Sequence, residues 1–246
     1  MQHVIFLHGF CENSSMWQSV VDFLNDADRK CHALDLPGFG ENNVCVSSIE
    51  EMSRYVFRYL DKHHIQNAVI VGHSMGGYVA LEMLHNNAER IDGIGLVHSH
   101  AAPDSPEKRD NREKLIQFVH RNGTAHFLKQ FAKELIDAHE TNQVLLQQTY
   151  DLVKNTRPDA VISASKAMIS RKDHRATLKT EKPVLWVIGK EDKFMPYESV
   201  VEQSKICPNA TVHILNGVGH LCMFEVPKQT EKVLQHFLDE IVELLH

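Results

Sequence analysis

The sequence predicts an α/β protein in which a mostly parallel sheet is flanked by helices. Over most of the chain, short apolar runs alternate with longer amphipathic ones, which is the pattern of successive β-α-β units. The runs at 69–71 and 184–188 are apolar at every position, as expected for strands that helices cover on both faces. A length of 246 residues, 43% of them hydrophobic, suits one domain of this class with an insertion.

About six strands are expected, each from a short apolar run. These runs lie at 3–7, 31–35, 68–72, 93–98, 184–188 and 211–215. Between them, Ser14 and Ser15 can cap a helix that presents one apolar stripe. Ser48 begins another helix, and Glu51 three residues later completes a capping-box pattern. The last helix begins near Pro227, and its apolar face consists of Val233, Leu234, Phe237, Leu238, Ile241 and Leu244.

The alternation of strands and helices stops between residues 103 and 182, where only helices are expected. Ser105 and Pro106 form an N-cap and first-turn pair, and Gly123 ends that helix. Three further helical runs cover 124–137, 141–155 and 159–170. We interpret this block as a helical lid, 103–182, inserted into a core formed by residues 1–102 and 183–246.

Composition excludes several classes of protein. The net charge of −6 argues against nucleic-acid binding, and no run of about 18 apolar residues predicts a membrane span. The five cysteines form no CxxC pair, so neither a zinc ribbon nor a disulfide scaffold is indicated. Free thiols, and a chain that enters its first strand without a signal-like segment, predict a cytoplasmic protein with no membrane partner.

The strongest chemical signal is a serine between a strand and a helix. The strand at 68–72 runs directly into Gly72-His73-Ser74-Met75-Gly76-Gly77, and an apolar helix follows. This is a GxSxG motif in the strand–turn–helix context that exposes the serine hydroxyl at the sheet edge. The turn leaves room only for very small neighbours, which Gly72 and Gly76 provide. Ser74 is therefore the candidate nucleophile.

A serine nucleophile needs a base and an acid that orients the base. Of the 17 histidines, His220 stands in a glycine-rich loop directly after the last strand. Asp192 follows the preceding strand, and Glu191 beside it is the alternative acid. The first strand leads into His8-Gly9-Phe10, so the Phe10 N–H and the Met75 N–H are the candidate donors to an oxyanion.

These motifs together resemble the α/β-hydrolase superfamily, in particular its small esterase-like members. HG at 8–9, DxPGxG from Asp35, GHSMGG, GxxD and the late GH at 219–220 occur in the family's order. The resemblance implies Ser74, Asp192 and His220 as nucleophile, acid and base, and Phe10 and Met75 as oxyanion donors. It also implies six parallel strands, because the chain starts at the strand that members usually count as their third. Glu41 and Asn42 stand where members often have serine, which is expected to reshape that loop.

Other residues near this site have more than one interpretation. His98, Phe127, Phe131 and Met168 are expected to contact substrate, although a histidine in a loop is often structural. Cys11 and Cys222 are expected to act as buried apolar residues. No HExxH motif or dinucleotide fingerprint occurs, so neither a metal nor a cofactor is expected.

We therefore expect a serine hydrolase that cleaves a small or medium carboxylic ester through an acyl-enzyme on Ser74. The alternatives are a C–C hydrolase, lyase or perhydrolase with the same triad, or a receptor of this fold with little turnover. The segment 103–182 carries 15 Lys and Arg against 11 Asp and Glu. This excess would either attract an anionic substrate or only solvate the outer faces of the lid helices. The oligomeric state is left open.

Overall fold

The computed structural model describes residues 1–136 and 142–245. Its sheet contains six strands, all parallel. Their order is β2-β1-β3-β4-β5-β6, and every expected strand is found to within two residues. The strands are β1 (Gln2–Leu7), β2 (Arg29–Leu34), β3 (Ala68–His73), β4 (Ile91–Val97), β5 (Val184–Gly189) and β6 (Ala210–Leu215). β3 and β5 are buried at every position, whereas the edge strand β6 leaves Val212 and Ile214 exposed.

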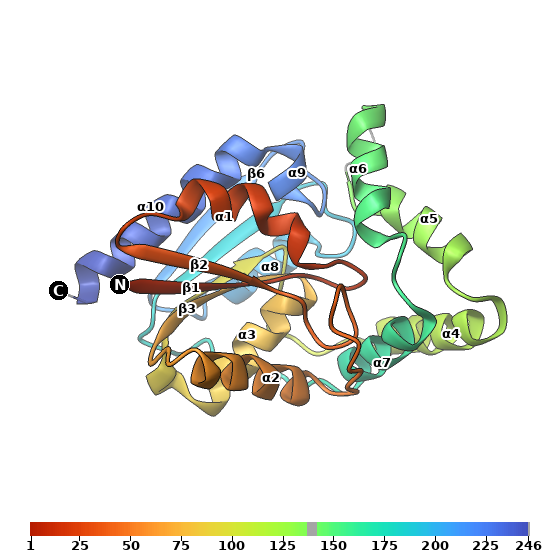
Figure 1. Cartoon of the computed structure of the whole chain (residues 1–246), viewed down its shortest axis with the longest axis horizontal. Coiled ribbons are helices and arrows are strands. Elements are labelled where there is room, and N and C mark those ends of the chain that lie inside the picture. Colours follow the sequence, from red (N-terminus) through yellow and green to blue (C-terminus); the bar gives the residue numbers. More distant parts are fainter. Residues whose placement is uncertain (137–141, 246) are drawn as a thin grey trace.

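Helices cover both faces of the sheet, with α1 and α10 on one face and α2 and α3 on the other (Figure 1). The core helices and short helical turns are η1 (Ser14–Trp17), α1 (Gln18–Leu24), α2 (Ile49–Lys62), α3 (Met75–Asn86), η2 (Ala88–Arg90), α8 (Tyr197–Ser204), α9 (Cys222–Glu225) and α10 (Pro227–Leu245). The expected apolar face of α10 packs into the core except for Leu244, which is 71% exposed near the end of the chain. This double cover explains why the central strands carry no polar face.

The capping predictions were confirmed at one helix and wrong at another. Ser48 Oγ accepts a hydrogen bond from the Glu51 N–H at 3.1 Å and donates one to Glu51 Oε2 at 3.0 Å. At the first helix the cap is Asn13, whose side chain accepts from the Ser15 N–H at 3.0 Å. Ser14 and Ser15 lie inside the η1 turn, because the carboxamide of Asn13 already accepts from the free N–H group at the start of this turn.

The segment between β4 and β5 contains only helices among its described residues, as expected. They are α4 (Pro106–Asn122), α5 (Ala125–Glu134), α6 (Gln143–Val153) and α7 (Pro158–Ile169). Ser105 caps α4 and Gly123, at φ 72°, ends it. The expected helix ends at Asp137 and Thr141 lie outside the described residues. None of the described helices combines the length and the apolar content that a membrane crossing requires.

The inserted helices lie beyond the carboxyl ends of the strands (Figure 1). Hydrogen bonds join them to loops that follow the strands. Thr156 Oγ1 donates to the Cys11 carbonyl at 2.8 Å, and the His220 N–H donates to the Leu135 carbonyl at 2.9 Å. The segment is therefore attached to the edge of the sheet where the sequence motifs meet.

Candidate active site

Ser74 occupies a strained turn between β3 and α3. Its backbone has φ 49° and ψ −111°, a region that residues other than glycine rarely adopt. A Cβ atom on Gly72 would lie 2.3 Å from the backbone of Gly76, so only glycine fits at position 72. The turn is held by a hydrogen bond from the Ser74 N–H to the Val97 carbonyl at 2.9 Å, and Ser99 Oγ donates to the Ser74 carbonyl at 2.8 Å. The GxSxG motif thus forms the expected sharp turn.

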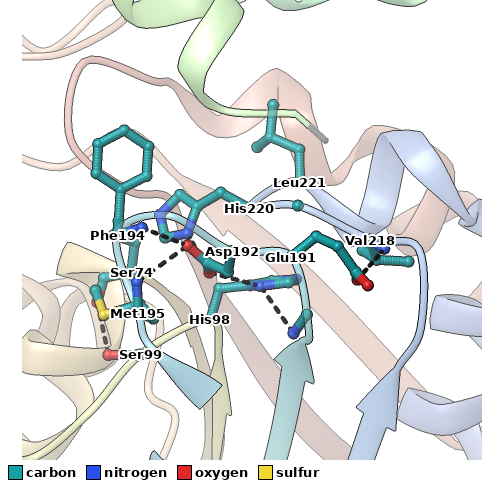
Figure 2. Close-up of polar contacts among 12 residues, drawn as sticks. Ser74, His98, Ser99, Glu191, Asp192, Phe194, Met195, Val218, His220 and Leu221 are labelled. Carbon is teal, nitrogen blue, oxygen red and sulfur yellow. Dashed lines mark hydrogen bonds and ion pairs between the residues drawn. The ribbon is translucent and has the colours of Figure 1, made fainter. Parts of the chain in front are cut away.

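His220 and Asp192 form a buried pair beside Ser74 (Figure 2). His220 Nδ1 lies 2.6 Å from Asp192 Oδ2. The other carboxylate oxygen, Oδ1, accepts from the N–H groups of Phe194 at 2.8 Å and Met195 at 3.1 Å. Burial raises the pKa of Asp192, but His220 and His98 outweigh this effect and hold the pKa well below its usual range. Asp192 is therefore a carboxylate that orients the His220 ring.

The alternative acid, Glu191, has a different partner. Its Oε2 accepts from the Val218 N–H at 3.1 Å, and Figure 2 shows the side chain turned away from His220. Adjacent residues in this loop point in different directions, and only Asp192 reaches the ring of His220. Of the two candidate acids, the structure brings Asp192 to the site.

His98 does not occupy the position that was expected of it. It does not line the cavity above Ser74; instead its ring is buried and its Nδ1 lies 3.0 Å from Asp192 Oδ2. The reason is the strand order, since β4 lies between β3 and β5 and the residue after β4 therefore meets the loop after β5. His98 Nε2 has no hydrogen-bond partner in the described part of the chain. His98 thus supports Asp192 from the side opposite the cavity.

The two histidines and Asp192 also have the composition of a metal site. Within the described ranges, they form the one such group whose ligand atoms all lie within 4.8 Å of one another. Both rings, however, make their hydrogen bonds to the same oxygen, Asp192 Oδ2, through Nδ1. An ion bound there would have to replace both hydrogen bonds and would remove the contact that orients His220.

A cavity of about 400 Å³ opens over Ser74 and His220. Phe10, Phe127, Phe131 and Met168 line it, as do Phe194 and the basic side chains of Lys108 and Arg112. The rings of Phe131 and Phe194 are 5.7 Å apart, and that of Phe194 is 5.0 Å from His220. Apart from His98, the residues expected to contact substrate therefore line the same cavity as Ser74 and His220.

Phe10 and Met75 come from neighbouring elements. β1 pairs with β3 in a register that places Leu7 opposite Gly72, so the loop after β1 lies beside the Ser74 turn. Met75 is the first residue of α3, where helix N–H groups have no partner within the helix. The Phe10 N–H donates no hydrogen bond to any other described residue. The two residues therefore lie beside the Ser74 turn.

His73 and Glu12 form a buried pair that the sequence motifs do not predict. His73 Nδ1 lies 2.8 Å from Glu12 Oε2, and His73 Nε2 lies 2.7 Å from the His220 carbonyl. The same Glu12 oxygen accepts from the Gly9 N–H at 2.6 Å. Burial raises the pKa of Glu12, but His73, His220 and His8 together lower it by more, so Glu12 is a carboxylate. The pair joins three loops of the site, and only His73, inside the GHSMGG motif, gave any signal in the sequence.

A nucleophile turn, a histidine–carboxylate pair and a cavity at the carboxyl edge of a parallel sheet define the α/β-hydrolase class of proteins. A family model described as the alpha/beta hydrolase fold matches residues 2–227. The chain belongs to this family.

Relatives within the family have several activities. A thermophilic esterase from Thermogutta terrifontis, solved with malate bound, is 25% identical with a TM-score of 0.92, and the match covers 98% of this chain and 90% of that one. A 2-hydroxy-6-oxononadienedioate/2-hydroxy-6-oxononatrienedioate hydrolase of Paraburkholderia phymatum is 26% identical over 96% of this chain and 87% of its own length. The biotin biosynthesis bifunctional protein BioHC of Teredinibacter turnerae is 25% identical, but this chain spans only 44% of its length.

Proposed function

We propose that the protein is a serine hydrolase that cleaves a small or medium carboxylic ester through an acyl-enzyme on Ser74. The observation that carries this proposal is that Ser74 and His220 line the same cavity, while Asp192 is hydrogen-bonded to Nδ1 of His220. The likeness to the Thermogutta terrifontis esterase supports an ester rather than another acyl substrate.

The proposed reaction follows from the atoms that face the cavity. His220 Nε2 takes the proton of Ser74 Oγ as the oxygen attacks the ester carbonyl, and Asp192 stabilises the imidazolium that forms. The N–H groups of Phe10 and Met75 hold the negative oxygen of the tetrahedral intermediate. His220 then gives its proton to the departing alkoxide, which leaves as the alcohol. A water molecule activated by His220 hydrolyses the acyl-enzyme and releases the acid, with no need for a metal or cofactor.

A second candidate, hydrolysis of a C–C bond next to a ketone, is favoured by one observation. The relative from Paraburkholderia phymatum is named for a dienedioate substrate, and it matches this chain over almost its whole length. The two activities differ in their leaving group, which is an alcohol for the ester and a carbon fragment for the ketone. Product analysis with one substrate of each kind distinguishes them.

The proposal is tested by multiple turnover of 4-nitrophenyl butyrate. Wild type is expected to release many equivalents of nitrophenol per protein, and Ser74→Ala is expected to release only the background amount. A receptor of the same fold would give one stoichiometric burst or no reaction, either of which would contradict the proposal. Intact-mass analysis after a fluorophosphonate probe should show one adduct, located on Ser74.

The pH dependence of kcat/KM for a neutral ester gives a further prediction. Burial lowers the pKa of His220 below its ordinary value of 6.5, although Asp192 opposes this effect. The neutral ring is the base, so protonation on the acid side of this pKa removes activity. We expect kcat/KM to rise with pH through a midpoint below 6.5 and to be constant near neutral pH. A midpoint above 6.5 would contradict the assignment of His220.

The surroundings of the site complete the proposal. The inserted segment 103–182 acts as a lid, because Phe127, Phe131 and Met168 from its helices line the cavity over Ser74. The five cysteines are free, which supports a reducing compartment such as the cytoplasm. The proposed partner is the small ester alone.

A further inference from the structure

We propose that Lys108 and Arg112 form an anion-binding subsite in the cavity, and that the preferred ester therefore carries a carboxylate. This inference rests on ester hydrolysis at Ser74 and adds the chemical class of the substrate. Both side chains line the cavity that contains Ser74 and His220. They are four residues apart on α4, so they lie on the same face of that helix.

A buried ion pair fixes Arg112 in place. Asp104 Oδ2 accepts from Arg112 Nε at 2.6 Å, and Asp104 Oδ1 accepts from Arg171 Nη1, also at 2.6 Å. Arg171 is buried, donates through Nη2 to the Ala102 carbonyl at 2.8 Å, and stacks 4.0 Å from the ring centre of Tyr78. Asp104 carries one negative charge against the two positive charges of Arg112 and Arg171, so the cluster has an excess of one positive charge.

The free end of Arg112 is available to a ligand. Its Nη1 and Nη2 atoms make no hydrogen bond to any residue in the described ranges, and its side chain is only 20% exposed. Two parallel N–H groups of a guanidinium match the two oxygens of a carboxylate. Arg171 of this cluster contacts the ring of Tyr78, which also lines the cavity. Tyr78 lies on α3, one helical turn after Ser74. Arg112 and the nucleophile therefore share one cavity.

Lys108 adds a second, partly buried positive charge. Its Nζ donates to the Phe194 carbonyl at 3.0 Å, which uses one of its three N–H groups. Burial lowers the pKa of Lys108, partly opposed by Asp104, so its ammonium group is incompletely solvated. A bound carboxylate would restore the interactions that this group has lost with water.

The acidic residues that line the cavity have hydrogen-bond partners other than Lys108 and Arg112. Glu12 is occupied by His73 and the Gly9 N–H, and Glu134 by Gln130 Nε2 at 2.9 Å. The basic residues of α4 thus fall into two groups. Side chains such as Arg109 and Lys114 are exposed and solvate the outer face of α4, whereas Lys108 and Arg112 face the cavity.

The test compares esters that differ only in charge. Monoethyl adipate is paired with the ethyl ester of adipic acid monoamide, which places the charge on the acyl side. In the second pair, 4-acetoxybenzoate and 4-acetoxybenzamide, the charge is on the alcohol side. Rates for this pair are corrected for spontaneous hydrolysis. In at least one pair, wild type should prefer the anion by about 10- to 100-fold in kcat/KM, the range of charge-assisted hydrogen bonds. The preference should persist in 0.5 M salt, because a desolvated contact is screened less than long-range attraction.

The variants assign the preference to the subsite. Arg112→Gln and Lys108→Met should each lower kcat/KM for the anionic ester by about 10-fold or more and change that of the neutral ester less than about threefold. Arg109→Gln is the matched control, an exposed arginine on the same helix, and should change neither. Melting temperatures show whether loss of the Asp104 contact unfolds Arg112→Gln; Lys108→Met does not touch Asp104 and keeps the test valid.

A binding measurement separates failure of the subsite from failure of the proposed function. Adipate should bind the wild type in titration calorimetry and bind Arg112→Gln and Lys108→Met at least about 10-fold more weakly. If no ester is turned over but adipate still binds in this pattern, the subsite stands and ester hydrolysis is wrong. If esters are turned over without charge preference, or if the variants weaken both members of a pair equally, the subsite is wrong.

Discussion

Ser74→Ala and His220→Ala are each expected to lower kcat for a neutral ester by a factor on the order of 10³ or more, and the double variant by little beyond either single one. The reason is that the two side chains perform one proton transfer. Without the serine there is no nucleophile, and without the imidazole the serine keeps its proton. Once either side chain is gone, the other has nothing left to contribute. Initial rates with 4-nitrophenyl butyrate provide the measurement.

The control for this comparison is a variant near the cavity but outside the proton transfer. Glu134→Gln removes an acidic residue from the cavity wall without touching Ser74 or His220. It should change kcat less than about threefold, within the range of ordinary surface substitutions. Losses in the two single variants that multiply in the double variant would mean that Ser74 and His220 act in different steps, and the proposed mechanism would be wrong.

Asp192→Asn is expected to lower kcat by a factor on the order of 10³ while leaving the fold intact. Asparagine keeps one oxygen, which can still accept from the N–H groups of Phe194 and Met195. The second oxygen becomes an NH₂ group, which cannot accept from His220 Nδ1. The ring then loses the contact that fixes its tautomer and that stabilises its charged form.

Glu191→Gln is the matched control, since it makes the same chemical change in the adjacent residue. Its carboxylate accepts from the Val218 N–H, which the amide oxygen of glutamine can also do. We expect less than a threefold change in kcat, about the scale of a preserved neutral hydrogen bond. Comparable losses in the two variants would show that the loop, rather than a specific acid, is required. A circular dichroism spectrum and a melting curve for each variant confirm that the fold is kept.

Much of the fold could be predicted because its signals are local. The runs at 69–71 in β3 and 184–188 in β5 are apolar at every position, as expected for strands covered on both faces. Ser105, Pro106 and Gly123 marked both ends of α4 correctly. The cap of the first helix was assigned to Ser14 or Ser15 instead of Asn13. All three residue types can cap a helix, and the choice among adjacent candidates depends on where the preceding loop turns.

Some residues of the site could be predicted from the local sequence, and others could not. Ser74 was predictable because a strand, a turn with glycines at fixed offsets and a helix are all written in one short stretch of sequence. For the acid, the local sequence offered both Asp192 and Glu191, and only the resemblance to the family favoured Asp192. The choice depends on which of two adjacent side chains faces His220 across a loop. His98 was placed in the pocket for the same reason, since nothing near it in the sequence shows that its ring meets Asp192.

By itself, the sequence determined the parallel α/β architecture, the helical segment between β4 and β5 and the identity of the serine on the turn. Only the tertiary structure decided that Asp192 orients His220, that Glu12 and His73 link three loops, and that Lys108 and Arg112 face the cavity while Arg109 faces water. The physical reason is the range of the interactions. Backbone conformation and burial periodicity arise among residues a few positions apart, whereas a hydrogen-bond partner or a cavity wall is created when the order of strands in the sheet brings distant loops to one edge.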